Sequence, residues 1–249
     1  MELRVLGCGD AFGSGGRLQT SYLVEGAPNG DAFLLDCGAT TMIALTKADI
    51  DPNAISTIYI SHLHGDHFSG LVWFFLHAQH RAQRSKPLTV IGPEGVRDRV
   101  LQTAELLFPG MTETAFRFDL EFVEFGLGSA GTHRDIALTT FEALHPSGAL
   151  SAMLRFQIGE KVLSFSGDTE WRDDLLSCAK DADLFICECY ALQAGVRYHL
   201  DWETLSARFN DITARKIVLT HMNGAMLAAS KTLSHPRVVF AEDEMVLSF

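Results

Sequence analysis

The chain has 249 residues and a formal net charge of −11 at pH 7, and 47% of its residues are hydrophobic. This length allows a sizeable core without disulfide bonds, and since no apolar run approaches the roughly 20 residues that cross a bilayer, we expect no membrane span. The acidic charge argues against a long nucleic acid as partner and favours a small or locally recognised substrate.

The N-terminal segment, MELRVLGCGDAFGSGG, begins with a strand-like run and then becomes rich in glycine. It lacks the basic region and the long apolar stretch of a signal peptide. The five cysteines are an odd number without CxxC spacing, which favours a reducing compartment, so we predict a cytoplasmic protein. In the glycine-rich loop, Ser14 and Arg17 are candidates for binding an anion, although loop flexibility is the simpler explanation of the glycines.

Short apolar runs separated by turn residues recur along the chain and predict a strand-rich protein. These runs are LRVLG, SYLVE, AFLLDCG, TIYIS, LTVIG, FRFDLEFVEFG, IALTTFEAL, AMLRFQI, KVLSFSG, LFICECY, KIVLTH and RVVFAEDEMVLSF. Helices are predicted over residues 40–48, 69–84, 93–108, 171–179 and 201–214. Early hairpin-like strands followed by alternating strands and helices indicate mixed sheets with helices outside. No repeat or linker divides the chain, so we expect one domain over residues 1–249.

Two segments leave alternatives open. The stretch from Leu107 to Thr132 is the least regular, and its pattern fits either a flap or an ordinary surface hairpin. In LFICECY, a period of two sends Cys187 and Cys189 to one face of a strand. We interpret these cysteines as a buried pair rather than as metal ligands.

A cluster of four potential metal ligands follows a predicted strand in TIYISHLHGDHFSGL, and consists of His62, His64, Asp66 and His67. His62 and His64 are two positions apart, so in extended backbone both imidazoles face the same way. Gly65 permits a tight turn, after which Asp66 and His67 can face a second ion. Imidazole and carboxylate donors suit zinc, and also iron or manganese. The pattern therefore predicts a metal site at a strand end, with zinc as the favoured ion.

The segment SHLHGDH resembles the HxHxDH signature of the metallo-β-lactamase superfamily. Later residues agree with that superfamily in their order along the chain, and each follows a strand-like run. They are His145 in FEALHPSG, Asp168 in LSFSGDT and His221 in IVLTHM. The resemblance implies an α+β fold, an αββα four-layer sandwich of two mixed β-sheets flanked by helices.

The same resemblance implies two divalent metal ions and a ligand set for each. One ion would be held by His62, His64 and His145, the other by Asp66, His67 and His221, with Asp168 bridging them. Because only Asp66 and Asp168 carry negative charge, such a site stays net positive and favours a bridging hydroxide and an anionic transition state. The predicted chemistry is metal-assisted hydrolysis, with Asp66 also orienting the hydroxide.

Two further features resemble the ribonuclease Z and phosphodiesterase branch of this superfamily. The first is the glycine-rich opening LRVLGCGDAFGSGGRLQTSYLVEG. The second is His199, which precedes a predicted helix where that branch carries a further histidine near the scissile phosphate. There His199 would protonate a leaving alkoxide or hold a phosphate oxygen. The alternative is that His199 packs beside Tyr198 and Trp202 or caps the helix.

One departure from the branch concerns the substrate. Members that process transfer RNA often carry a long arm between the third-motif histidine and the bridging aspartate, whereas ALSAMLRFQIGEKVLSFSG has room for only two strands and a turn. We therefore predict a phosphodiesterase-like hydrolase for a small, anionic substrate such as a cyclic nucleotide or cyclic phosphate. The alternatives are hydrolysis of a lactone, thioester or β-lactam, and iron-dependent redox chemistry on the same fold. A homodimer is plausible for the branch.

Overall fold

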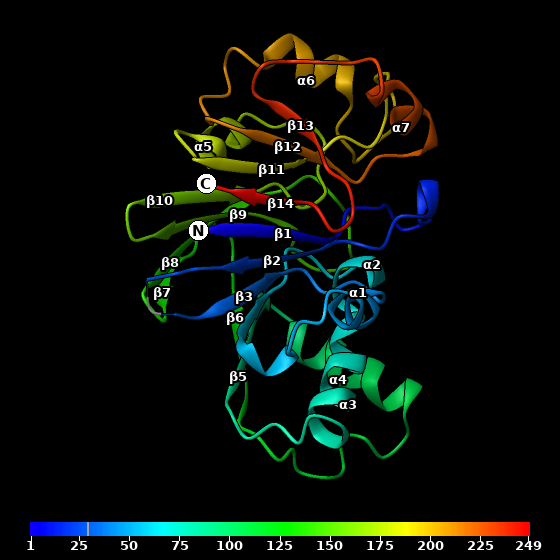
Figure 1. Cartoon of the computed structure of the whole chain (residues 1–249), viewed down its shortest axis with the longest axis vertical. Coiled ribbons are helices and arrows are strands. Elements are labelled where there is room, and N and C mark those ends of the chain that lie inside the picture. Colours follow the sequence, from blue (N-terminus) through cyan, green and yellow to red (C-terminus); the bar gives the residue numbers. More distant parts are fainter. Residues whose placement is uncertain (29) are drawn as a thin grey trace.

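Two β-sheets pack face to face in the computed structural model, which describes residues 1–28 and 30–249, and helices cover the outer side of each sheet (Figure 1). This is the αββα arrangement that the sequence resemblance implied. Both sheets are mixed, with antiparallel strands in one part and parallel strands in the other. No helix among the described residues is long and apolar enough to cross a membrane.

The first sheet joins the early strands to the last strand of the chain. In spatial order its strands are β14 (Val246–Ser248), β1 (Glu2–Gly7), β2 (Ser21–Glu25), β3 (Ala32–Leu35), β4 (Ile55–Tyr59), β5 (Leu88–Pro93) and β6 (Leu120–Phe125). Strand β1 pairs antiparallel with β14 and β2, and β2 pairs antiparallel with β3. From β3 to β6 the neighbours are parallel, so their carboxyl ends lie at one edge of the sheet.

The second sheet holds the middle and the C-terminal part of the chain. In spatial order its strands are β13 (Val238–Phe240), β12 (Ile217–Thr220), β11 (Leu184–Glu188), β10 (Lys161–Phe165), β9 (Ala152–Ile158), β8 (Ile136–Glu142) and β7 (Ala130–His133). The strands from β7 to β10 are antiparallel neighbours, and those from β10 to β13 are parallel. Residues 159 and 160 alone join β9 to β10, which confirms the predicted pair of strands with a turn before Asp168.

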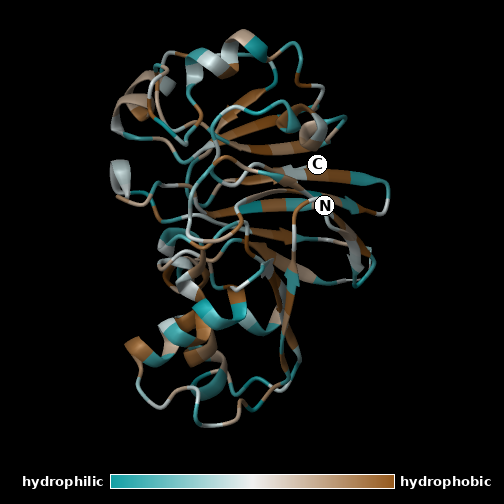
Figure 2. Cartoon of the chain, turned by 180° about the vertical axis from the view of Figure 1, so that it is seen from behind, coloured by the Kyte–Doolittle hydropathy of each residue, from teal (hydrophilic) through white to brown (hydrophobic). Residues whose placement is uncertain are grey.

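Each strand divides its side chains between the space between the sheets and a helix layer, because successive side chains point to opposite faces. In β2, Tyr22 and Val24 belong to the apolar cluster between the sheets, whereas Leu23 belongs to the cluster under the helices of the first sheet. Accordingly, most strands consist largely of hydrophobic residues, whereas the helices and loops contain both hydrophobic and hydrophilic residues (Figure 2).

The helices form two layers. The first sheet is covered by α1 (Thr41–Lys47), α3 (Gly70–His80) and α4 (Val96–Leu107), and the second by α5 (Asp174–Ala179), α6 (Trp202–Arg208) and α7 (Gly224–Ser230). Two of these helices begin at side-chain caps. The Asp201 carboxylate accepts a hydrogen bond from the Thr204 amide at 2.7 Å, and the Asn223 side chain accepts one from the Met226 amide at 2.9 Å. These caps fix the helix starts that follow the predicted residues His199 and His221.

Several element predictions need correction. The short helices α2 (Gly65–Phe68) and α7 were not predicted, and α3 ends at His80 rather than near Arg84. The C-terminal run RVVFAEDEMVLSF forms β13 and β14, which lie in different sheets. The hairpin interpretation of Leu107 to Thr132 is wrong, because β6 and β7 also lie in different sheets and the segment crosses between them. Cys187 and Cys189 are both buried, as predicted.

Candidate active site

The candidate site lies where strands of both sheets end. His62 follows β4, His145 follows β8, Asp168 follows β10 and His221 follows β12, each within three positions of the strand's last residue. The backbone of His221 is left-handed, with φ of 58°, which is uncommon for a residue other than glycine and is often found at functional sites. Loops at strand ends can hold polar side chains on a rigid scaffold while one side stays open to solvent.

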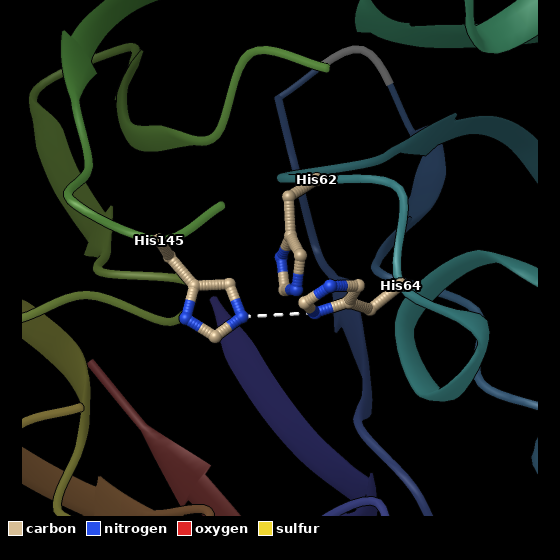
Figure 3. Close-up of side chains that lie close together, drawn as sticks. All are labelled: His62, His64 and His145. Carbon is tan, nitrogen blue, oxygen red and sulfur yellow. Dashed lines mark hydrogen bonds between the residues drawn. The ribbon is translucent and has the colours of Figure 1, made fainter. Parts of the chain in front are cut away.

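His62, His64 and His145 form the first group of converging side chains (Figure 3). The three rings come from two separate loops, with ring centroids 5.0 Å apart for His62 and His64 and 4.9 Å apart for His62 and His145. Nδ1 of His64 lies 2.9 Å from Nε2 of His145. The nitrogen atoms therefore approach one another closely enough to share a single ion.

The second group centres on Asp168 and includes Asp66, His67 and His221. Oδ2 of Asp168 lies 3.3 Å from Nε2 of His221 and 3.4 Å from Nε2 of His67. The same oxygen lies 3.8 Å from Nε2 of His62 and 3.7 Å from Nε2 of His145, which belong to the first group. One carboxylate oxygen thus stands between both groups, where the sequence placed a bridging ligand.

The donor set fits divalent cations. Nε2 of His62 and Nε2 of His67 are buried, and neither has a hydrogen-bond partner among the described residues. Buried nitrogen atoms without partners are costly, and they cluster here beside carboxylates, which is the ligand chemistry of zinc, manganese and iron. The kinds of side chain gathered here therefore support the predicted use of divalent metal.

A ring of outer hydrogen bonds orients these imidazoles. Asp36 Oδ2 lies 2.6 Å from Nδ1 of His67, and Ser61 Oγ lies 3.1 Å from Nδ1 of His62. The Tyr198 carbonyl lies 2.8 Å from Nδ1 of His145. Each contact occupies one nitrogen of an imidazole ring and leaves the other nitrogen directed toward the neighbouring ligand-type side chains. Sequence analysis missed Asp36, although its place directly after the apolar strand β3 was a clue.

The charges within the site reinforce one another. Burial opposes ionisation of Asp168, but the surrounding imidazoles, His221 and His67 first, hold the pKa of this carboxyl well below its usual range. Burial likewise opposes protonation of His67, and the carboxylates of Asp168 and Asp66 raise its pKa well above the usual value. The cluster therefore keeps its carboxylates ionised and ready to attract cations.

His199 lies beside the cluster and forms a dyad with Glu188, a residue that sequence analysis did not single out. Nδ1 of His199 lies 3.1 Å from Oε2 of Glu188, which is fully buried at the end of β11. The His199 ring stacks on Tyr190 at a centroid distance of 4.6 Å and contacts His145 at 4.9 Å. Glu188 lies between Cys187 and Cys189 in the sequence. Because successive side chains of a strand point to opposite faces, the Glu188 carboxylate points away from the face that holds the two thiols.

Glu188 also changes the acidity of His199. Burial lowers the pKa of His199, but the hydrogen bond and the charge of Glu188 outweigh it and raise the value to about 9. Burial raises the pKa of Glu188, whereas the hydrogen bond and the charge of His199 lower it. The dyad therefore retains a proton at neutral pH that His199 can donate.

A cavity of about 300 Å³ opens onto these side chains. Its lining comprises Ala11, Phe12, His64, Asp66, His145, Asp168, Tyr190, Val196, His199 and His221. Ser14 and Arg17 are not in this lining, and both are engaged elsewhere. Ser14 Oγ donates to Asp10, and the Arg17 guanidinium donates to the Ala241 carbonyl. These contacts argue against the anion site considered for the glycine-rich loop.

Comparison with known proteins places the chain in a family. The profile of a family described as anti-Pycsar protein Apyc1 matches residues 1–245. Ribonuclease Z of Agathobacter rectalis is 25% identical over 260 residues, which cover 86% of this chain and 85% of that protein. Ribonuclease Z of Borrelia hermsii is 40% identical over 107 residues, which cover 43% of this chain and only 33% of that protein.

Solved structures resemble the chain over its whole length. Human short-form tRNase Z has a TM-score of 0.77 at 23% identity and covers 100% of this chain and 99% of its own. The metallo-β-lactamase fold protein YhfI from Bacillus subtilis has a TM-score of 0.78 at 18% identity, with 99% of this chain and 98% of its own covered. At these identities the likeness concerns the fold, and it confirms the predicted metallo-β-lactamase architecture.

Proposed function

Because the chain belongs to the anti-Pycsar protein Apyc1 family, within the ribonuclease Z-like branch of the metallo-β-lactamase superfamily, we propose that it hydrolyses a small phosphodiester with the help of two divalent cations. The observation that carries this proposal is the position of Asp168 between two groups of ligand-type side chains, with the His199 and Glu188 dyad beside them. A cyclic nucleotide or another cyclic phosphate is the substrate class we favour.

The proposed ligands divide as the two groups do. His62, His64 and His145 would hold one cation, Asp66, His67 and His221 the second, and Asp168 both. When bound, such cations polarise a phosphoryl oxygen and make water acidic enough to lose a proton near neutral pH. Zinc is favoured by the five imidazole nitrogens of this set, and manganese and iron fit the carboxylates as well.

The protein's own groups would divide the remaining work. Asp66, almost buried at the cavity wall, would orient the attacking water by accepting a hydrogen bond from it. His199 would donate its proton to the departing alkoxide, with Glu188 holding the ring in position. Proton transfer of this kind contributes about 10²- to 10⁴-fold to a rate.

An anionic substrate of modest size fits this cavity once the proposed cations are bound, because their positive charge would exceed the negative charge of Asp66 and Asp168. Among the described residues that line it there is no lysine or arginine, so a phosphate would be met by bound cations and by His199. Long RNA is a weaker candidate for two reasons. The overall charge is −11, and β9 and β10 are joined by residues 159 and 160 alone, which leaves no arm at that place.

Activity and metal content of the same protein samples test the proposal. Wild type and Asp66→Ala would be loaded with zinc or manganese and assayed on bis(p-nitrophenyl) phosphate, cyclic nucleotides, a thioester, a β-lactam and a precursor transfer RNA. We expect two metal ions per chain and cleavage of the small phosphodiesters that Asp66→Ala loses, with the exposed variant Asp98→Ala as control. Inactivity toward every small phosphodiester would overturn the proposal, and redox-active iron with no hydrolysis would favour the oxidoreductase alternative.

A further inference from the structure

The lining of the active-site cavity has two unlike parts. One part consists of Tyr190 and the histidines and carboxylates described above, whereas Ala11, Phe12 and Val196 are apolar. The side chain of Phe12 is 83% exposed and that of Val196 is 41% exposed. A single exposed apolar residue needs no explanation. Here, however, two loops far apart in the sequence each place one at the same opening.

The loop that carries Phe12 is held firmly despite the exposure of this side chain. Asp10 is fully buried, and its Oδ1 accepts hydrogen bonds from the amides of Phe12 at 3.2 Å and Ser14 at 2.9 Å. Its Oδ2 accepts a third from the Ser14 hydroxyl at 2.7 Å. The 3-10 turn η1 (Ser14–Gly16) then packs against α7. An aromatic ring on such a backbone can contact a ligand with little loss of conformational entropy.

The loop that carries Val196 also carries His199, so the two positions are coupled. Both ends of this loop are fixed, since the Trp202 amide donates to the Ala191 carbonyl at 2.9 Å and Asp201 caps α6. The carbonyl of Tyr198, between Val196 and His199, lies against His145. The loop therefore places an apolar side chain at a set position relative to the proton donor.

We infer that Phe12 and Val196 form a subsite for a flat ring attached to the phosphodiester, so that the ring packs on Phe12 while the phosphate faces the histidines. This inference rests on the proposed function and names the part of the substrate that lies away from the reacting atoms. Stacking on an aromatic side chain tolerates every nucleobase, because each base has a π-face. Apart from Tyr190, every polar side chain of the lining is either a proposed cation ligand or His199, so the subsite would select for a ring rather than for one base.

A matched pair of substrates tests the inference. Adenosine 3′,5′-cyclic phosphate would be compared with its abasic analogue, in which hydrogen replaces the base, using wild type, Phe12→Ala, Phe12→Tyr and Val196→Ala. Leu106→Ala is the control, since Leu106 is 81% exposed but lies on α4 away from the cavity lining. We expect Phe12→Ala to raise KM for the nucleotide roughly 5- to 50-fold with little change in kcat or in turnover of the abasic analogue. Phe12→Tyr should restore the wild-type KM.

The subsite and the proposed function fail in different ways. If wild type cleaves both substrates but Phe12→Ala affects them equally or not at all, the subsite is wrong and the hydrolase proposal stands. If wild type cleaves neither, the proposed function fails. A binding measurement then still reports on the subsite, with 2-aminopurine riboside 3′,5′-cyclic phosphorothioate as the probe. Quenching of its fluorescence by wild type and Leu106→Ala but not by Phe12→Ala supports ring contact, and absence of quenching by wild type overturns it.

Discussion

Oδ2 of Asp36 lies 2.6 Å from Nδ1 of His67, and both side chains are buried behind the candidate metal cluster. The carboxylate also accepts hydrogen bonds from the Ser61 amide and hydroxyl at 2.7 Å each, so its orientation is fixed. With Nδ1 of His67 donating to Asp36, Nε2, which faces Asp168, would be the nitrogen that loses its proton and supplies the electron pair when a cation binds. Asp36 would thus determine which nitrogen of His67 binds a cation in the proposed site.

Asp36→Asn should weaken cation binding by about 10- to 100-fold while the fold persists. The backbone at Asp36 is left-handed, with φ of 55°, and asparagine tolerates that conformation, so the substitution removes charge with little strain. Competition with a chromogenic zinc chelator measures the change. Asp98→Asn, which removes the same charge from an exposed position, should bind zinc as wild type does. Equal zinc affinity in both variants would show that Asp36 has no part in the site.

Glu188→Gln should move the alkaline limit of the pH–rate profile to lower pH. Glu188 raises the pKa of His199 to about 9 by stabilising the imidazolium. A neutral glutamine lowers that pKa, so the protonated His199 needed for donation disappears at a lower pH. The profile of kcat between pH 6 and 11 measures the shift, and Glu160→Gln on the exposed turn after β9 is the charge-matched control. An unchanged alkaline limit would exclude His199 as the proton donor.

Gly38, which packs against the HxHxDH segment, and Gly65, which lies within it, should respond differently to alanine. A Cβ at Gly38 would lie 2.4 Å from the carbonyl oxygen of Asp66, whereas a Cβ at Gly65 would meet nothing within 4 Å. We therefore expect Gly38→Ala to lower the free energy of unfolding by about 1–3 kcal/mol and to weaken zinc binding by displacing Asp66. Gly65→Ala should leave both unchanged. Urea unfolding and zinc titration of the two variants check this, and equal behaviour would contradict the packing seen here.

Chelation should lower the melting temperature reversibly. Cations that bind only the folded state stabilise it by about 2.7 kcal/mol at a hundredfold excess over Kd, which corresponds to roughly 5–10 °C for a chain of this size. Without a cation, Nε2 of His62 and Nε2 of His67 stay buried with no hydrogen-bond partner among the described residues, and this destabilises the folded state. Thermal unfolding with EDTA, and again after zinc is restored, measures the effect. Zinc should raise the melting temperature of Asp168→Asn much less than that of wild type. An equal rise in both proteins would show that the ions bind elsewhere.

Local pattern was sufficient for much of the fold. The alternation of apolar residues in runs such as SYLVE predicted strands, and Tyr22 and Leu23 do face different layers. Helix ends were less predictable, because α3 stops at His80 while the helical composition continues to Arg84. The crossing between sheets from β6 to β7 could not be read from the sequence either, because which strands pair depends on long-range contacts rather than on neighbouring residues.

The sequence by itself determined which side chains are candidate metal ligands, because ligand type and close spacing are properties of a short segment such as His62 to His67. Only the tertiary structure decided what surrounds them. Asp36 is 31 positions from His67 and Glu188 is 11 positions from His199, so neither contact leaves a local pattern. Phe12 and Val196 line one cavity although 184 positions separate them, so this relationship leaves no local pattern either. The two loops follow β1 and β11, which lie in different sheets, so it is the packing of one sheet on the other that brings them together.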